Sequence, residues 1–268
     1  MNTSLFVFRP LPAGILTVIF VFGLIMPLLA SAELSNDPLL GPGLRIRPAY
    51  DGSATKHIEL VPVVRYFGQP WFARSTQGVL EGGARMEFAP GLHGGGQLAY
   101  EPGRKTSDSD FLKSNNVSDI KLGASAGVHI EWDHKFGPMP ITLLTRVRQH
   151  IDSDRGTQAD VRFSAGFYRG GRVGAGVFIQ TTWANAKSAS SLYGITPQQS
   201  ATTGLPPFSA GSGLLFASYG LLWSVDLSQT WIVVGSLESR HLHGAAAHSP
   251  LVERKENYYA SAGLAYRF

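Results

Sequence analysis

A strict two-residue alternation of apolar and polar side chains after residue 43 constrains the fold more than any other feature. It is clearest between Asp119 and Asp133. One set there holds Ile120, Leu122, Ala124, Ala126, Val128, Ile130 and Trp132, and the other holds Lys121, Gly123, Ser125, Gly127, His129, Glu131 and Asp133. Successive side chains of a β-strand point to opposite faces, so this stretch predicts a strand with one apolar and one polar face. It is much longer than the ~5–6 residues of an average strand.

The same pattern recurs along the chain and predicts an all-β protein. The expected strands lie near residues 44–50, 58–66, 70–75, 79–88, 92–101, 119–133, 141–150, 158–168, 172–183, 213–225, 231–241 and 257–268. The third is short, and ten strands is the alternative if residues 70–88 do not split into two. The fold class expected is an antiparallel transmembrane β-barrel of the outer-membrane type with about 12 strands.

The lengths of the connections agree with a barrel. Long linkers at 102–118, 184–212 and 242–256 follow the fifth, ninth and eleventh strands, all odd-numbered. Short turns such as Ala89-Pro90-Gly91 follow even-numbered strands. Outer-membrane barrels have an even strand number, short periplasmic turns and longer external loops. The chain therefore fits a barrel whose termini are both periplasmic.

Composition and aromatic placement also favour a membrane barrel. Only 16% of the residues are charged, against about 25% in soluble proteins, and a mean hydropathy of +0.02 argues against a bundle of membrane helices. Aromatic residues lie near the ends of the expected strands, as in the girdles of a spanning barrel. They are Tyr50, Tyr66, Tyr100, Trp132, Trp183, Trp231, Tyr258 and Phe268. Core aromatics at the edges of a sandwich are the alternative.

The N-terminal segment has the pattern of an export signal. Arg9 precedes a nearly continuous apolar run from Leu11 to Leu29, and Ala30 and Ala32 have the spacing of a signal-peptidase site. We expect residues 1–32 to be a cleaved signal peptide, 33–43 a periplasmic lead and 44–268 the barrel. An uncleaved anchor helix is the alternative, because the run approaches the ~20 residues that span a bilayer.

The last residues predict an assembly signal. The chain stops at Phe268, with Tyr266 on the same face and Gly263 shortly before. This pattern resembles the terminal-strand signal that the barrel assembly machinery reads. Because an unpaired strand edge in hydrocarbon leaves backbone groups without partners, residues 257–268 are expected to close on residues 44–50.

The sequence offers no set of residues for catalysis or for a cofactor. There is no Cys, and His241, His243 and His248 lack an acid at ligand spacing, so we interpret them as solvated. Arg and Lys are scattered among acids, which excludes nucleic acid as a partner. The expected lumenal cations are predicted to pair with acids across the strands. The cations are Lys121, Arg146, Arg148 and Arg162, and the acids are Asp160, Glu131, Glu81 and Glu87.

Several loop motifs resemble the MipA/OmpV family of MltA-interacting proteins. They fall in the same order as in that family and cover nearly all of residues 40–268. They are Pro48-Ala-Tyr50-Asp-Gly52-Ser53, Tyr100-Glu-Pro102-Gly103-Arg104, Gly194-Ile-Thr196-Pro197-Gln198-Gln199, Gly204-Leu205-Pro206, Ser249-Pro250-Leu251-Val252 and Tyr266-Arg267-Phe268.

The resemblance implies an outer-membrane barrel without catalytic residues or cofactor. The named family member is regarded as a scaffold that links a murein transglycosylase to a murein synthase. From this we expect a non-enzymatic scaffold or interaction protein in the cell outer membrane, in contact with outer-membrane lipid. Because the periplasmic turns are short, such a partner would have to bind the barrel rim or residues 33–43. A narrow solute channel, an envelope or adhesion protein and a lipid hydrolase are the alternatives.

Overall fold

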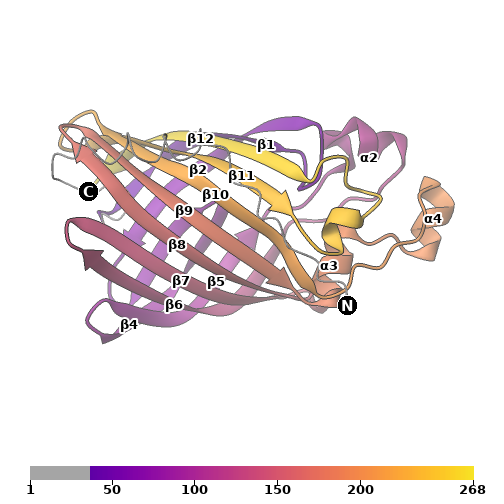
Figure 1. Ribbon diagram of the computed structural model, residues 1–268, viewed down its shortest axis with the longest axis horizontal. Helices are drawn as coiled ribbons and strands as arrows, with labels where there is room; N and C mark the ends of the chain where they lie inside the picture. Colours follow the sequence, from indigo (N-terminus) through magenta and orange to yellow (C-terminus); the bar gives the residue numbers. More distant parts are fainter. Residues whose placement is uncertain (1–36) are drawn as a thin grey trace, which may run out of the picture.

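The computed structural model describes residues 37–268, which form a closed barrel of twelve antiparallel strands (Figure 1). The predicted cleavage residues Ala30 and Ala32 lie outside the described residues. The strands are β1 (Leu39–Pro48), β2 (Lys56–Phe67), β3 (Trp71–Thr76), β4 (Val79–Ala89), β5 (Leu92–Glu101), β6 (Gly123–Phe136), β7 (Met139–His150), β8 (Thr157–Gly170), β9 (Val173–Ala184), β10 (Gly213–Asp226), β11 (Trp231–Leu242) and β12 (Glu256–Arg267).

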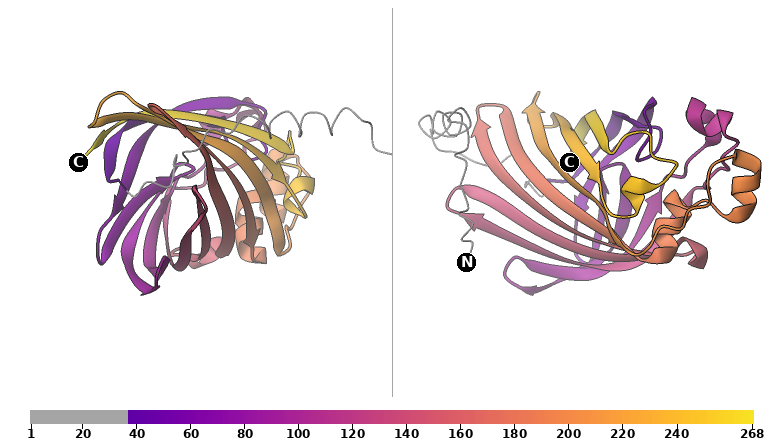
Figure 2. Two further views of the ribbon diagram at one scale, coloured as in Figure 1. Left: turned by 60° about the vertical axis from the view of Figure 1, so that its left-hand side comes forward. Right: turned by 45° about the vertical axis from the view of Figure 1, so that its right-hand side comes forward.

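Every strand pairs with its neighbours in sequence, and β12 returns to pair with β1. The closing register runs from Leu39 opposite Arg267 to Ile46 opposite Ala260. The predicted closure of the last strand on the first is therefore confirmed. Figure 2 shows the strands running obliquely around the barrel, as closure of a sheet requires.

Short helices gather at one end of the barrel, together with the long connections (Figures 1 and 2). The connections after β5, β9 and β11 are the long ones, as predicted. The helices are η1 (Thr106–Asp108), α2 (Asp110–Ser114), η2 (Ser153–Arg155), α3 (Ala186–Tyr193), α4 (Pro197–Thr203) and η3 (Ala246–His248). No helix within residues 37–268 has the length and apolarity to cross a membrane. We call this end the loop end, and the end with the C-terminus the turn end.

Two sequence predictions about strand boundaries are wrong. β1 begins at Leu39 rather than 44, so residues 39–43 belong to the barrel wall and not to the lead segment. Gly41, Pro42 and Gly43 interrupt the apolar–polar alternation there. A Cβ at Gly41 would lie 2.0 Å from the Leu264 carbonyl oxygen, so the close approach of β12 to β1 requires glycine at this position. At the other boundary, residues 119–122 are loop, and β6 begins only at Gly123. The ten-strand alternative is also wrong, because β3 and β4 are separate strands.

The alternation sorts the side chains as predicted. On β6, the outward Val128 is 60% exposed and the inward His129 is 2% exposed. Apolar side chains that face outward recur around the barrel, on strands from β1 to β12, including Leu44, Ile58, Met86, Phe163, Ile179, Leu237 and Leu264. Apolar side chains thus face outward and charged side chains face inward. A soluble barrel has the opposite arrangement, and this one is typical of an outer-membrane-type barrel.

Candidate functional site: the barrel lumen

The lumen collects most of the buried charge of the described chain. The inward positions of the strands place these residues there, each less than one tenth exposed. They are Arg45, Arg74, Glu81, Arg85, Glu131, Arg146, Arg148, Asp160, Arg162, Glu238 and Arg240. Ions buried away from water persist only where they are paired and hydrogen-bonded, so their partners decide what the lumen can do.

Five of these residues form a network, which we call the β3–β8 ion network, on one wall of the lumen. Arg146 Nη1 lies 2.9 Å from Glu81 Oε1, and Arg146 Nε donates to Asp160 Oδ2 at 2.8 Å. Arg74 Nε donates to Glu81 Oε1 at 2.5 Å, and Arg74 Nη1 donates to Glu131. Because guanidinium groups bind carboxylates through several donors at once, the network ties five strands together through their side chains.

A second cluster lies nearer the loop end. Arg240 Nη1 donates to Asp51 Oδ2 at 2.7 Å, and Arg240 also pairs with Glu238 at 2.9 Å. The Tyr259 hydroxyl donates to Asp51. Burial alone would raise the pKa of the loop residue Asp51, but the Arg240 charge and these hydrogen bonds hold its pKa below the usual range. Asp51 therefore stays ionised and fixes the connection between β1 and β2 over the lumen.

The long connections cover the loop end with a cap that has its own apolar core. Leu112 of α2 is fully buried in it, beside Ala49, Val117, Ile195 and Leu251. The Tyr50 hydroxyl donates to the Leu251 carbonyl at 2.8 Å. A second apolar group, centred on Tyr193, Leu215 and Leu242, continues the cap over β9, β10 and β11. Side chains from four connections thus pack over the mouth of the barrel.

Further polar bonds hold the cap on the barrel. The Ser249 Oγ donates to the Tyr193 carbonyl at 2.6 Å, and Arg104 Nη1 donates to the Leu192 carbonyl at 3.0 Å. Burial raises the pKa of the Tyr193 hydroxyl well above its ordinary value, so this residue stays neutral. The cap is consequently an ordered part of the molecule.

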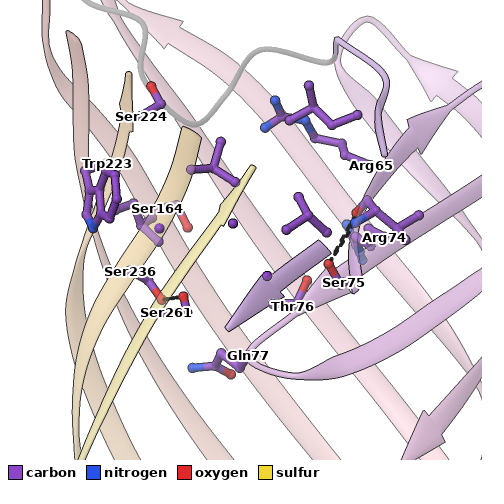
Figure 3. Close-up of a pocket in the computed structure, with 18 of the residues that line it drawn as sticks. Arg65, Arg74, Ser75, Thr76, Gln77, Ser164, Trp223, Ser224, Ser236 and Ser261 are labelled. Carbon is purple, nitrogen blue, oxygen red and sulfur yellow. Dashed lines mark hydrogen bonds between the residues drawn. The ribbon is translucent and has the colours of Figure 1, made fainter. Parts of the chain in front are cut away.

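Two cavities remain between the cap, the ion network and the opposite wall. The larger has a volume of about 270 Å³, is lined by residues of β1–β4 and β6–β12, and reaches the turn end at Arg169, Asp226 and Arg267. The smaller, about 210 Å³, lies under the cap beside Arg45, Arg47 and Arg240. Figure 3 shows the larger cavity, with Arg65, Arg74 and Ser75 on one side and Trp223, Ser236 and Ser261 on the other.

The predicted lumenal pairs are partly confirmed. Arg146 and Arg148 do pair with Asp160. Lys121 lies exposed in the loop before β6, and Glu87 lies exposed near the turn end, so neither enters the lumen. Arg162 instead lies over the Phe178 ring, with its Cζ 3.8 Å from the ring centroid.

Sequence reasoning missed Arg74 and the contact of Arg240 with Asp51. The two-residue alternation places Arg74 on the face opposite to Trp71 and Ala73 of β3, which is a signal that could have found it. Asp51 lies in a turn 189 residues away from Arg240, and no sequence pattern connects them.

The other predicted residues are dispersed. The His241 and His243 rings lie 4.9 Å apart, and His248 Nδ1 contacts the Gly244 carbonyl oxygen. Within residues 37–268, no group of three or more His, Asp or Glu is arranged to hold a metal ion. Gly263 lies opposite Gly43 at the closing seam. Tyr266 packs its ring against Trp231, and Phe268 is exposed at the turn end.

Comparison with family models identifies the chain. The model described as "MltA-interacting protein MipA" matches residues 40–268, which is the whole barrel apart from the first residue of β1. The chain belongs to the MipA family. No curated protein matches this MipA-family chain. Among solved structures, a chain titled "CymD monoaromatic hydrocarbon channel" is similar at 10% identity and a TM-score of 0.37, over 90% of this chain and 95% of that one.

Proposed function

We propose that this MipA-family protein is a non-enzymatic barrel of the cell outer membrane that binds a murein transglycosylase at its turn end. The family description, "MltA-interacting protein", supports a partner of this kind. The outer apolar surface supports a position in the membrane, because an apolar band on the outside is what lipid requires. The export signal predicted at residues 1–32 would bring the chain there.

The observation that carries the proposal is the closed lumen. The cap covers the loop end, and the β3–β8 ion network occupies the interior. In a barrel whose loop end is covered and whose interior is occupied, the rim is the surface available for binding a partner protein. The turn end would face the periplasm, where murein lies, so a murein enzyme can reach only that rim.

The turn end carries a cluster of charges suited to such a contact. Arg267 pairs with Asp226 at 2.7 Å and with Asp37 at 3.1 Å, and the half-exposed Arg169 lies 3.9 Å from Asp226. Exposed charges of this kind favour recognition and rapid association more than they add affinity. They make Arg169 a suitable position for a cross-linker.

The test is site-specific photo-cross-linking in intact envelopes. A photoreactive residue at Arg169 should capture a murein transglycosylase, identified by mass spectrometry. The same residue at Gln198, exposed on α4 at the opposite end, is the matched control and should capture none. Equal capture at both positions, or capture of the enzyme at neither, would contradict the proposal.

A narrow solute channel is the second candidate, and the two cavities inside the lumen favour it. Conductance across a planar bilayer separates the two functions. A barrel closed by its cap should give no stable conductance steps, whereas a channel should give steps that grow when the cap is loosened.

A lipid hydrolase is the third candidate from the sequence. It would need a serine activated by histidine, but no hydroxyl–imidazole hydrogen bond is found within residues 37–268. Turnover of phospholipid by the purified protein is therefore expected to be absent.

A further inference from the structure

The barrel wall has little strand pairing between β2 and β3. β2 and β3 share only three residue pairs, from Arg65 opposite Arg74 to Phe67 opposite Phe72. β3 ends at Thr76, and a two-residue turn at Gln77 and Gly78, both with positive φ, leads directly into β4. β2 continues past this hairpin for eight more residues, 56–63, and no strand of the described chain pairs with that side of it.

The free side of β2 exposes backbone polar groups. The Val64 N–H donates to Ser75 Oγ at 3.1 Å, so residues of the same parity direct their N–H and C=O groups to this side. Leu60 and Ile58 have that parity and no backbone partner there among the described residues. Pro62 also has the parity of Val64. A proline is tolerated at a strand edge because it has no N–H to leave unpaired.

The gap runs from the loop end, where β2 begins, into the outer apolar surface. Leu60, on its β2 side, is 81% exposed. Leu80, the outward residue at the start of β4, lies opposite Ser75 in the β3–β4 hairpin, and Ile46 lies opposite Ile58 on β1. Unpartnered backbone groups at membrane depth cost several kcal/mol each unless they line a hydrated or occupied cavity. The gap must therefore open into such a space.

The larger cavity lies directly behind the gap. Its lining includes Val61 and Val63, the inward residues of the free part of β2, and Thr76 and Gln77 at the end of the hairpin. Across the cavity lie the inward apolar residues Leu222, Ile232 and Val234. Arg74 and Glu131 of the ion network line the same cavity, so its wall is apolar along this strip and charged elsewhere.

One end of the cavity offers a free donor. Gln77 Nε2 is buried and has no hydrogen-bond partner among the described residues. Gln77 also lines the smaller cavity under the cap, so it lies where the two spaces meet. A buried donor without a partner costs ~1–3 kcal/mol, which a ligand that supplies an acceptor would recover.

We propose that the gap between β2 and the β3–β4 hairpin is a lateral portal through which a single-chain lipid enters the lumen from the membrane. The hydrocarbon chain lies along Val61, Val63 and Val234, and the head group accepts a hydrogen bond from Gln77 Nε2. The portal does not depend on the proposed contact with a murein enzyme, because it lies in the wall and that contact lies at the rim.

Photolabelling of the wild-type protein tests the portal. The protein is reconstituted in phosphatidylcholine vesicles that contain a long-chain fatty acid with a diazirine in mid-chain, and the labelled residues are mapped by mass spectrometry. We expect label on Val61, Val63 and Val234 in addition to outward residues such as Leu60. Excess unlabelled fatty acid should suppress the inward label and leave the outward label unchanged, because only the inward site saturates.

Two cavity-filling variants sharpen the test. Val61→Trp should lower the label on Val234 about tenfold, equivalent to ~1.4 kcal/mol of binding free energy. Val128→Trp, at an outward position on β6 away from the gap, is the matched control and should leave that label unchanged. Val234→Trp repeats the test from the opposite wall, with the label read on Val63. Label confined to outward residues, inward label that does not saturate, or unchanged inward label in Val61→Trp would overturn the portal.

Discussion

Arg146 illustrates how single residues keep charge inside this barrel. It is buried between Glu81 and Asp160, and removing it would leave two carboxylates short of a partner. Breaking a buried pair costs ~3–5 kcal/mol, so Arg146→Met should lower the free energy of unfolding by about that amount. Asp160→Asn in the same chain should recover part of the loss, with a coupling of ~0.5–3 kcal/mol. Urea unfolding in vesicles measures both, and additive losses would contradict direct coupling.

Val128 tests which side chains of β6 face the lipid. Its side chain points outward from the middle of β6. An arginine on the lipid face near the bilayer midplane costs ~2–4 kcal/mol, so Val128→Arg should sharply reduce the heat-modifiable, folded barrel. Val128→Leu is the control and should fold normally. The neighbouring His129 is a poor control, because its ring packs against Phe72 in the lumen at 4.8 Å between centroids.

At the scale of elements, β12 both closes the barrel and ends the chain. Its pairing with β1 leaves Phe268 exposed at the turn end, with its N–H 3.4 Å from the Pro38 carbonyl oxygen. If the assembly machinery reads Gly263, Tyr266 and Phe268, deletion of Phe268 should lower the amount of assembled barrel without affecting export. Deletion of the exposed loop residue Ser212 should do neither. Normal assembly of the Phe268 deletion, measured in membrane fractions, would contradict the signal.

The cap is a second element with its own stability. Leu112→Ala removes a fully buried side chain, and a leucine-to-alanine change in a core costs ~2–5 kcal/mol. We expect the cap to loosen while the barrel stays folded, which should expose Lys113 to trypsin added to whole cells. Substitutions to alanine in α4, which has no buried residue, provide the control and should not increase cleavage. Unfolding of the whole barrel by Leu112→Ala would contradict a separate cap.

At the scale of the whole molecule, the sheet closes around the barrel, but the side of β2 that faces β3 has no paired strand from Lys56 to Val63. Amide N–H groups of Ile58 and Leu60 lack strand partners on that edge, whereas Glu59 pairs with Arg45 on β1. Hydrogen exchange in vesicles should therefore be fast at Ile58 and Leu60 and slow at Glu59. Equal protection of all three amides would mean that another segment covers the edge.

Much of the barrel follows from local pattern. The alternation on β6, the parity of the long connections and the apolar end of β12 predicted twelve strands and their outward faces, because the two-residue period depends only on the strand itself. The boundaries at Leu39 and Gly123 could not be predicted in the same way. Glycine and proline in β1 carry no hydrophobic signal, and an alternating loop before β6 is indistinguishable from a strand without its partner.

The strands, their outward faces and the family could thus be predicted from residues close together in the chain, and the closure of β12 on β1 from the requirement that no strand edge stay unpaired in lipid. Tertiary structure alone decided what the interior contains. The contacts of Arg74 with Glu131, of Arg240 with Asp51 and of Tyr50 with Leu251 join residues 57 to 201 positions apart. The register around the closed sheet creates these contacts. The same register leaves residues 56–63 of β2 without a paired strand on the β3 side, so no local pattern predicts the contacts or the gap.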